Sequence, residues 1–201
     1  MENELNRLYK KLWETKGSRF IAANRMEKHA FYSHLTISAL SVYIISLNLT
    51  VIFENRPEFL SDSIITYSTI CLSIFMLVIS TIISSKKYSE KASKFHDCGK
   101  AVSELYDRLC LIRNSDKKVS EEEIIQIQEK YHSLINKFDL NHSTLDFRIF
   151  QSQNIGEYER KEHPKLFVIF VWFQSIVKTY LIYYLLLLIP LYFLLKLIPS
   201  A

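Results

Sequence analysis

The fold of this chain is decided by two long apolar stretches, FYSHLTISALSVYIISLNLTVIF (residues 31–53) and SIITYSTICLSIFMLVISTIISS (residues 63–85). After His34 the first stretch has no ionisable side chain except Tyr43 for 19 residues, and the second has no formal charge over 23 residues. A helix needs about 20 apolar residues to cross the hydrocarbon layer of a bilayer. The two stretches therefore predict a transmembrane helical hairpin, joined by a turn over residues 54–62.

Basic residues flank the hairpin on both outer sides. They are Arg19, Arg25 and Lys28 before the first stretch, and Lys86, Lys87, Lys91 and Lys94 after the second. The turn between the stretches carries one arginine against three acidic residues. Because positively charged flanks stay on the cytoplasmic side, we expect the N-terminus and residues 86–165 to be cytoplasmic. The protein would then be a multi-pass membrane protein, with membrane lipid as its first partner.

The segments outside the hairpin show helical patterns. In residues 4–30 the apolar residues recur at helical spacing on one face and basic residues occupy the remainder, as in an amphipathic helix. Residues 86–113 keep helical spacing and are expected to continue the second span as one helix, which ends at residues 114–118. Ser120 and Glu123 form a capping-box pattern, and the apolar stripe that follows needs a partner, most simply the helix of residues 86–113. Residues 141–165 are polar and predict little helix.

The last apolar segment, residues 166–197, allows two interpretations. As one helix it would be about 48 Å long, which exceeds a simple crossing, and Lys178 interrupts it. In one interpretation residues 166–177 lie along the interface and residues 179–195 cross. In the other, a single tilted span turns Lys178 toward a water-filled interior. The first is the less costly, because a lysine deep in lipid costs about 2.5 kcal/mol or more.

Composition agrees with a helical protein. Three glycines and four prolines are few for 201 residues, and three cysteines without paired spacing do not indicate a disulfide framework. A net charge of +4 does not by itself indicate nucleic-acid binding. We therefore predict an all-α membrane protein with a two-span helical hairpin, a cytoplasmic helical bundle and a C-terminal apolar helix. The expected domain boundaries are 1–30, 31–85, 86–165 and 166–201.

Polar side chains recur every three or four residues along both spans, so that each span has one polar stripe. They are His34, Ser38, Ser41 and Asn48 in the first span, and Thr66, Thr69, Ser73, Ser80 and Ser84 in the second. Such stripes turn away from lipid. They either join helices within the hairpin or an oligomer, or line a pore with a hydrophobic constriction at residues 74–79.

Charged residues outside the spans also allow two interpretations. Arg19, Arg25 and Lys28 either set topology and bind lipid headgroups, or form an anion site for a phosphate. His142 and Asp146 are four residues apart and either share a structural hydrogen bond or contact a ligand. No catalytic motif and no shared-face set of metal ligands is visible, so we predict no enzyme activity, no catalytic residue, no metal and no cofactor.

Three motifs, in this order around the hairpin, resemble a known family. They are TKGSRFIAANRM (residues 15–26), YSEKASKFHDC (residues 88–98) and NHSTLDF (residues 141–147). The pattern is similar to the SLATT family of two-span effectors associated with SMODS nucleotidyltransferases and SLOG sensors. It is closest to the subfamily that has an Asn-His-x-x-x-Asp-aromatic motif.

The resemblance implies a pore-forming effector of bacterial anti-phage defence that acts by abortive infection. A nucleotide or oligonucleotide signal from a SMODS-type nucleotidyltransferase would regulate a homo-oligomer. By the resemblance, the family signature is carried by Arg19, Phe20, Arg25, His96, Cys98, His142 and Asp146, which could equally be structural anchors of the cytoplasmic bundle. The candidate signal-binding residues are Arg19, Arg25, Lys28, His142 and Asp146. The alternative is a non-conducting membrane scaffold that recruits a partner through its cytoplasmic helices.

Overall fold

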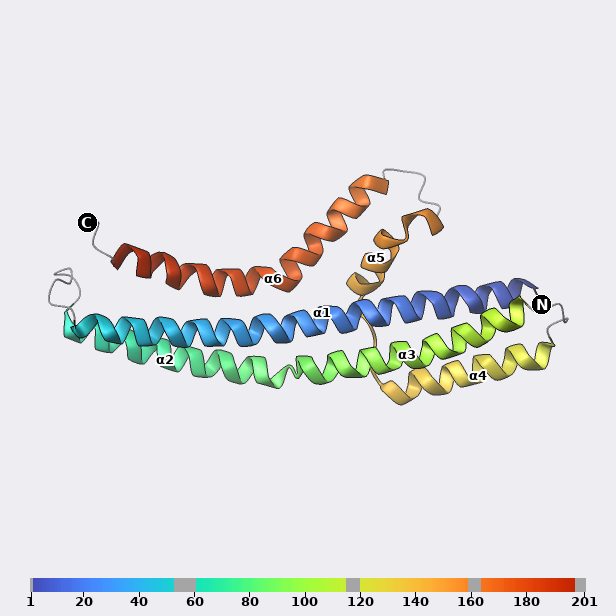
Figure 1. Ribbon diagram of the computed structural model, residues 1–201, viewed down its shortest axis with the longest axis horizontal. Helices are drawn as coiled ribbons and strands as arrows, with labels where there is room; N and C mark the ends of the chain where they lie inside the picture. Colours follow the sequence, from blue (N-terminus) through green and yellow to red (C-terminus); the bar gives the residue numbers. More distant parts are fainter. Residues whose placement is uncertain (1, 53–60, 115–119, 159–163, 198–201) are drawn as a thin grey trace. The chain divides into compact units, whose positions relative to one another are not determined.

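The computed structural model describes residues 2–52, 61–114, 120–158 and 164–197, and these residues form helices and short connections without a strand (Figure 1). The helices are α1 (Glu2–Leu49), the 3-10 helix η1 (Thr50–Ile52), α2 (Asp62–Ser85), α3 (Tyr88–Arg113), α4 (Glu121–Phe138), α5 (Thr144–Gln153), the 3-10 helix η2 (Ile155–Glu157) and α6 (Pro164–Leu197). The predicted all-α fold is confirmed. Most of the predicted turn, and most of the predicted helix end at 114–118, lies outside the described residues.

The chain divides into two compact units. The first contains Met1–Glu27 and Ser89–Ser175, and the second contains Lys28–Tyr88 and Ile176–Ala201. The chain therefore passes between the units three times, within α1, at the start of α3 and within α6.

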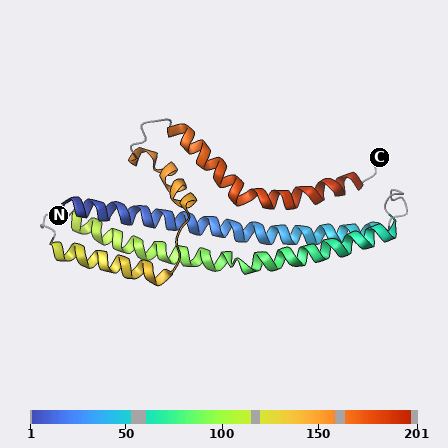
Figure 2. The same cartoon turned by 180° about the vertical axis from the view of Figure 1, so that it is seen from behind.

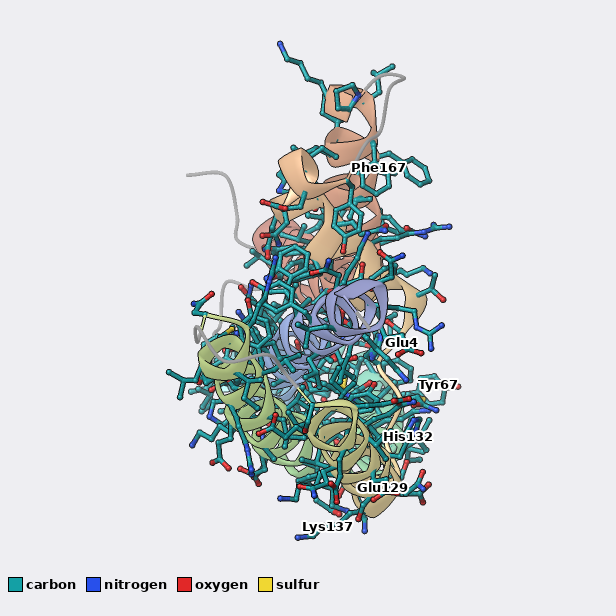
Figure 3. The ribbon with its side chains drawn as sticks, turned by 90° about the vertical axis from the view of Figure 1, so that its right-hand side faces the viewer. Glu4, Tyr67, Glu129, His132, Lys137 and Phe167 are labelled. Atoms are coloured by element: carbon teal, nitrogen blue, oxygen red, sulfur yellow. The ribbon has the colours of Figure 1, made fainter. Side chains whose placement is uncertain are left out.

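The first part of α1, α3 and α4 lie side by side and form the core of the first unit (Figures 1 and 2). Its buried residues are Leu5, Leu8, Leu12, Cys98, Val102, Leu109, Ile124, Ile127 and Tyr131. The predicted partner of the α4 stripe, the helix that follows the second span, is confirmed. The polar residues Glu129, His132 and Lys137 project from α4 away from α1 (Figure 3).

Local capping signals determine where several helices begin. The Ser120–Glu123 capping box is present: Glu123 N–H donates to Ser120 Oγ at 3.2 Å, and Ser120 N–H donates to Glu123 Oε2 at 3.1 Å. In the same way Ser61 is the N-cap of α2. These side chains satisfy backbone donors that a helix start leaves without a partner.

The sequence interpretation was wrong at two places. The helix expected to run on from the second span is broken at Lys86–Lys87, where Lys87 has a φ of 49°. Residues 141–165, expected to hold little helix, contain α5, whose N-cap is Ser143 in a capping box with Asp146. That signal was present in the sequence, but the segment is short and polar and lacks a long apolar stripe.

The described part of the second unit contains three long helical segments, with the 3-10 helix η1 at the end of the first. They are the part of α1 from Lys28 onward, α2, and the part of α6 from Ile176 onward. By length and composition, the helical segments Asn3–Ile52, Asp62–Arg113 and Pro164–Tyr192 each hold a window apolar enough to cross a membrane. The protein is therefore a membrane protein, and α6 is a continuous helix that supplies a third candidate span.

A close approach between helices depends on Gly17. A Cβ atom added to this residue of α1 would overlap the ring of Phe150, on α5. The Phe150 ring also packs edge-on against Trp13, with 4.6 Å between ring centroids. The absence of a side chain at Gly17 therefore allows α5 to reach α1.

We expect Gly17→Ala to lower the free energy of unfolding by about 1–3 kcal/mol, because the added methyl group must displace a buried ring. Thermal unfolding of the detergent-solubilised protein, followed by circular dichroism, measures the change. Gly156→Ala is the matched control, because no atom lies within 4 Å of a Cβ there. Equal unfolding temperatures for the two variants would contradict the proposed contact.

Candidate functional site

The predicted polar stripes of the hairpin differ in exposure within the second unit. His34, Ser38 and Asn48 of α1 are exposed, and Ser41 is half-buried beside Met76, with 3.3 Å between Oγ and Sδ. On α2 the exposed members are Thr66, Ser73 and Ser84, and the half-buried members are Thr69 and Ser80. Most of the stripe therefore lies on the outer surface of the three-helix unit.

Several of the stripe hydroxyls are bonded to their own helix. Thr69, Ser73 and Ser80 donate to carbonyls three or four residues earlier, at 2.7–2.9 Å. Such back-bonding satisfies a hydroxyl in an apolar environment without a second helix or water. Asn48 also donates to the Ile44 carbonyl at 3.0 Å, but an amide side chain has a further donor and an acceptor.

A different polar face of α1, not identified from the sequence, packs against α6. Tyr183 Oη lies 3.1 Å from His29 Nδ1 and 3.0 Å from Ser33 Oγ, and all three residues are buried. The His29 ring also stacks on Tyr88 with 5.0 Å between centroids. Further along, Tyr43 Oη donates to the Leu187 carbonyl at 3.0 Å. These bonds attach the third candidate span to the first.

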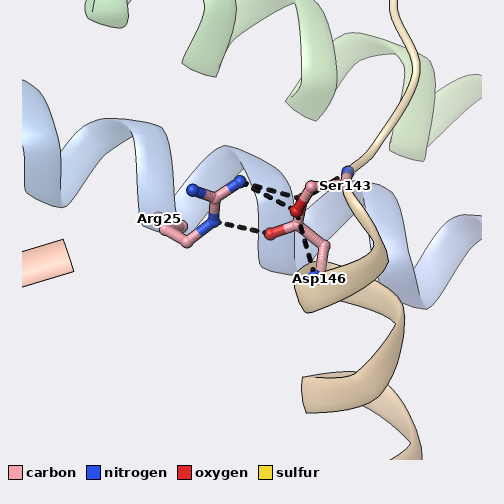
Figure 4. A network of polar contacts seen from close by, with 3 residues as sticks. All are labelled: Arg25, Ser143 and Asp146. Atoms are coloured by element: carbon pink, nitrogen blue, oxygen red, sulfur yellow. Dashed lines mark hydrogen bonds and ion pairs between the residues drawn. The ribbon is translucent and has the colours of Figure 1, made fainter. Parts of the chain in front are cut away.

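In the first unit, Arg25 of α1 forms one polar network with Ser143 and Asp146 at the start of α5 (Figure 4). Arg25 Nε donates to Asp146 Oδ1 at 2.7 Å, and Arg25 Nη2 donates to Asp146 Oδ2 at 3.1 Å. Ser143 N–H and Ser143 Oγ donate to the same Oδ2 at 2.8 and 2.7 Å. An arginine of α1 therefore bonds the carboxylate that forms the capping box of α5. We call this network the α1–α5 clasp.

The electrostatics of the clasp favour an ionised Asp146. Burial by itself raises the pKa of this carboxyl, but hydrogen bonds from Arg25 and Ser143 and the charge of Arg25 outweigh it, so that the pKa lies below its usual value. The Asp146 side chain is 1% exposed and that of Arg25 is 18% exposed. Both charges are thus engaged with each other in this arrangement.

Arg19 and His142 lie beside the clasp. Arg19 is 1% exposed, donates through Nη1 to the Leu140 carbonyl just past the end of α4, and lies over the Phe95 ring at 5.6 Å. Its position suits the negative end of the α4 dipole. Burial and the nearby Arg19 charge lower the pKa of His142, while Asp146 acts in the opposite direction. Asp146 is bonded to Arg25, whereas His142 Nδ1 is buried and has no hydrogen-bond partner among the described residues.

The structure thus brings four of the five candidate signal-binding residues together where the α4–α5 connection meets α1. Lys28, the fifth, is exposed and belongs to the second unit. Arg19 and Arg25 are held by protein groups rather than presented to solvent. Among the residues that the structure describes, no group of three histidine, cysteine or acidic side chains could hold a metal ion.

The comparison with protein families covers nearly the whole chain. Residues 1–196 match the model of the SMODS and SLOG-associating 2TM effector domain family 5. The chain belongs to this family. It is therefore a membrane effector of the type associated with SMODS and SLOG defence systems. No curated protein and no solved structure matches the chain. The family description refers to two spans, whereas this SLATT protein has a third candidate span in α6.

We expect Asp146→Asn to destabilise the SLATT protein by roughly 3 kcal/mol, because the change leaves the partly buried Arg25 without its counter-ion. Urea unfolding in detergent measures the loss. Glu90→Gln is the control: its ion pair with Lys94 is about half exposed, so we expect at most ~0.5 kcal/mol there. A loss for Asp146→Asn no larger than that of the control would show that the clasp does not stabilise the unit.

His142, beside the clasp, makes the stability of the folded protein depend on pH. Because its folded-state pKa is lowered, the unfolded chain takes up a proton first as the pH falls through about 6.5, the ordinary value for histidine. Stability should therefore decrease between pH 7.5 and 5.5. The contribution of Asp146 is lost at lower pH, beginning below the ordinary carboxyl pKa of about 4 and ending once the pH has fallen past its own depressed pKa. Unfolding temperatures at the two pH values should differ less for His142→Asn than for the unchanged protein, and an equal difference would contradict this assignment.

Proposed function

We propose that this SLATT protein is a homo-oligomeric, pore-forming effector whose opening is controlled by a nucleotide signal from a SMODS-type nucleotidyltransferase. Opening would permeabilise the inner membrane and arrest the infected cell. The family match supports the effector role. The pore is supported by one observation, the exposed polar side chains on the membrane-spanning part of α1.

His34 and Asn48 carry this argument. Both are exposed in the three-helix unit, and neither side chain can satisfy all its polar atoms on its own helix. An unsatisfied polar group in hydrocarbon costs several kcal/mol. With Ser38 between them on the same face, they are best accommodated against a water-filled lumen surrounded by copies of the chain.

We further propose that the first unit lies in the cytoplasm. The basic residues on both flanks of the hairpin support this orientation. The three passages of the chain between the units agree with it, because each joins the first unit to one candidate span. On α6 the passage at Ser175–Ile176 precedes Lys178, which is exposed. This favours a crossing segment that begins near Lys178, with the preceding part of α6 at the interface.

One observation favours the alternative, a non-conducting scaffold. Ser73, Ser80 and Thr69 satisfy their hydroxyls on their own backbone, so these hydroxyls do not require water. In a scaffold, His34 and Asn48 would be satisfied by a neighbouring copy. The two candidates differ in ion conductance.

We expect Ser38→Leu with Asn48→Leu to reduce membrane depolarisation at least tenfold in bacteria that express the protein with its nucleotidyltransferase. The leucines remove polar atoms from the proposed lumen and should favour dewetting. A potential-sensitive dye and propidium iodide entry provide the measurement, and immunoblots of membrane fractions verify equal insertion.

Val42→Leu with Ile45→Leu is the matched control, because both residues are exposed and apolar on the same helix. This control should depolarise like the unchanged protein. Unaltered depolarisation by the leucine pair at Ser38 and Asn48 would exclude this face as the lumen. No depolarisation by any of the proteins, with normal insertion, would favour the scaffold.

A further inference from the structure

A groove with a volume of about 570 Å³ lies between the beginning of α1 and the first turns of α4, wholly within the first unit. Its volume falls in the range of small-ligand sites, roughly 300–1,000 Å³. None of the residues expected to bind the signal lines it. Unlike the clasp, whose arginine is paired with Asp146, the groove presents cations to solvent.

One wall of the groove is basic. Arg7, Lys10 and Lys11 of α1 line it at spacings of three and four residues, and all three are exposed. The Lys10 ammonium lies 5.4 Å from the Tyr158 ring centroid and the Lys11 ammonium 4.7 Å from that of Tyr131. Aromatic rings position an ammonium group without neutralising its charge. These lysines therefore remain able to bind an anion, unlike Arg25.

The floor and the opposite wall have different chemistry. Leu8 and Ile124 form a buried apolar floor, and Ile125 presents an apolar surface that is 48% exposed. Glu121 and Gln128 of α4 also line the groove. A flat, partly apolar ring with hydrogen-bonding edges fits such a wall, since it can pack on isoleucine while a carboxylate and an amide bond its edge.

The charge balance restricts the ligand further. The groove has three acidic residues, Glu4, Glu14 and Glu121, against its three cations. Glu14 accepts a hydrogen bond from Tyr158 Oη at 2.8 Å and is held at the groove edge. An evenly basic surface would suit a long polyanion such as duplex nucleic acid, whereas this mixed lining suits a ligand with few phosphates and neutral hydrogen-bonding groups.

We propose that this groove is the binding site for a small nucleotide, with phosphates on Arg7, Lys10 and Lys11 and the base against Ile125, between Glu121 and Gln128. The proposal rests on the proposed nucleotide regulation and gives it a location. It moves the site away from the clasp, where Arg25 pairs with Asp146 and Arg19 is buried.

The test is calorimetric titration of the full-length protein in detergent with ATP, cyclic di-AMP and inorganic pyrophosphate. We expect at least one nucleotide to bind, at least tenfold more tightly than pyrophosphate, and Arg7→Ala with Lys10→Ala to weaken it at least tenfold. Lys130→Ala with Lys137→Ala, two exposed lysines of α4 that do not line the groove, should bind like the unchanged protein. Unfolding temperatures verify that both variants are folded.

Three outcomes would overturn the proposal. They are no binding of either nucleotide at millimolar concentration, equal binding by the groove variant, or pyrophosphate binding as tight as that of the nucleotides. Dye release from liposomes that contain the same proteins separates this site from the pore. Release that is unaffected by the groove variant would leave the pore proposal standing without this site. Nucleotide binding without release would support the site and contradict the pore.

Discussion

The ion pair between Arg25 and Asp146 is the interaction on which the packing of α5 against α1 depends. A buried carboxylate carries a desolvation cost of several kcal/mol, which is offset only when all its bonds are in place. Here a bidentate arginine and two donors from Ser143 provide those bonds. The same carboxylate also begins α5, because Asp146 is the N3 residue of its capping box. The start of α5 and its packing against α1 therefore depend on the same carboxylate.

Features that arise from neighbouring residues could be predicted from the sequence. Two uncharged stretches predicted the hairpin, and Ser120 with Glu123 predicted the start of α4. The residues of the clasp belong to motifs that were identified in the sequence. Their pairing could not be predicted, because Arg25 and Asp146 are 121 residues apart. For the same reason α5 was missed: its stability comes from Arg25 and from the space at Gly17 rather than from its own apolar pattern.

The first span has two polar faces, and the spacing of its polar residues does not predict which of them contacts another helix. Ser33 and Thr36 recur at the same helical spacing as Ser38 and Ser41, so spacing alone cannot tell which face joins a helix. The structure resolves this through α6, since Ser33 bonds Tyr183 and Thr36 is fully buried. The partner of this face is more than 140 residues away in the chain. The third candidate span thus occupies one polar face of α1 and leaves the other exposed.

The cations of the first unit have separate roles, and this separation bears on how a signal would act. Arg19 and Arg25 hold the α4–α5 connection, whereas Arg7, Lys10 and Lys11 line the groove. A ligand shifts a conformational equilibrium only as far as it binds one arrangement better than another. A nucleotide in the groove would contact α1 and α4 together, and α1 continues without interruption to Leu49. Any change in how α4 packs on α1 therefore acts on the helix that also carries His34 and Asn48.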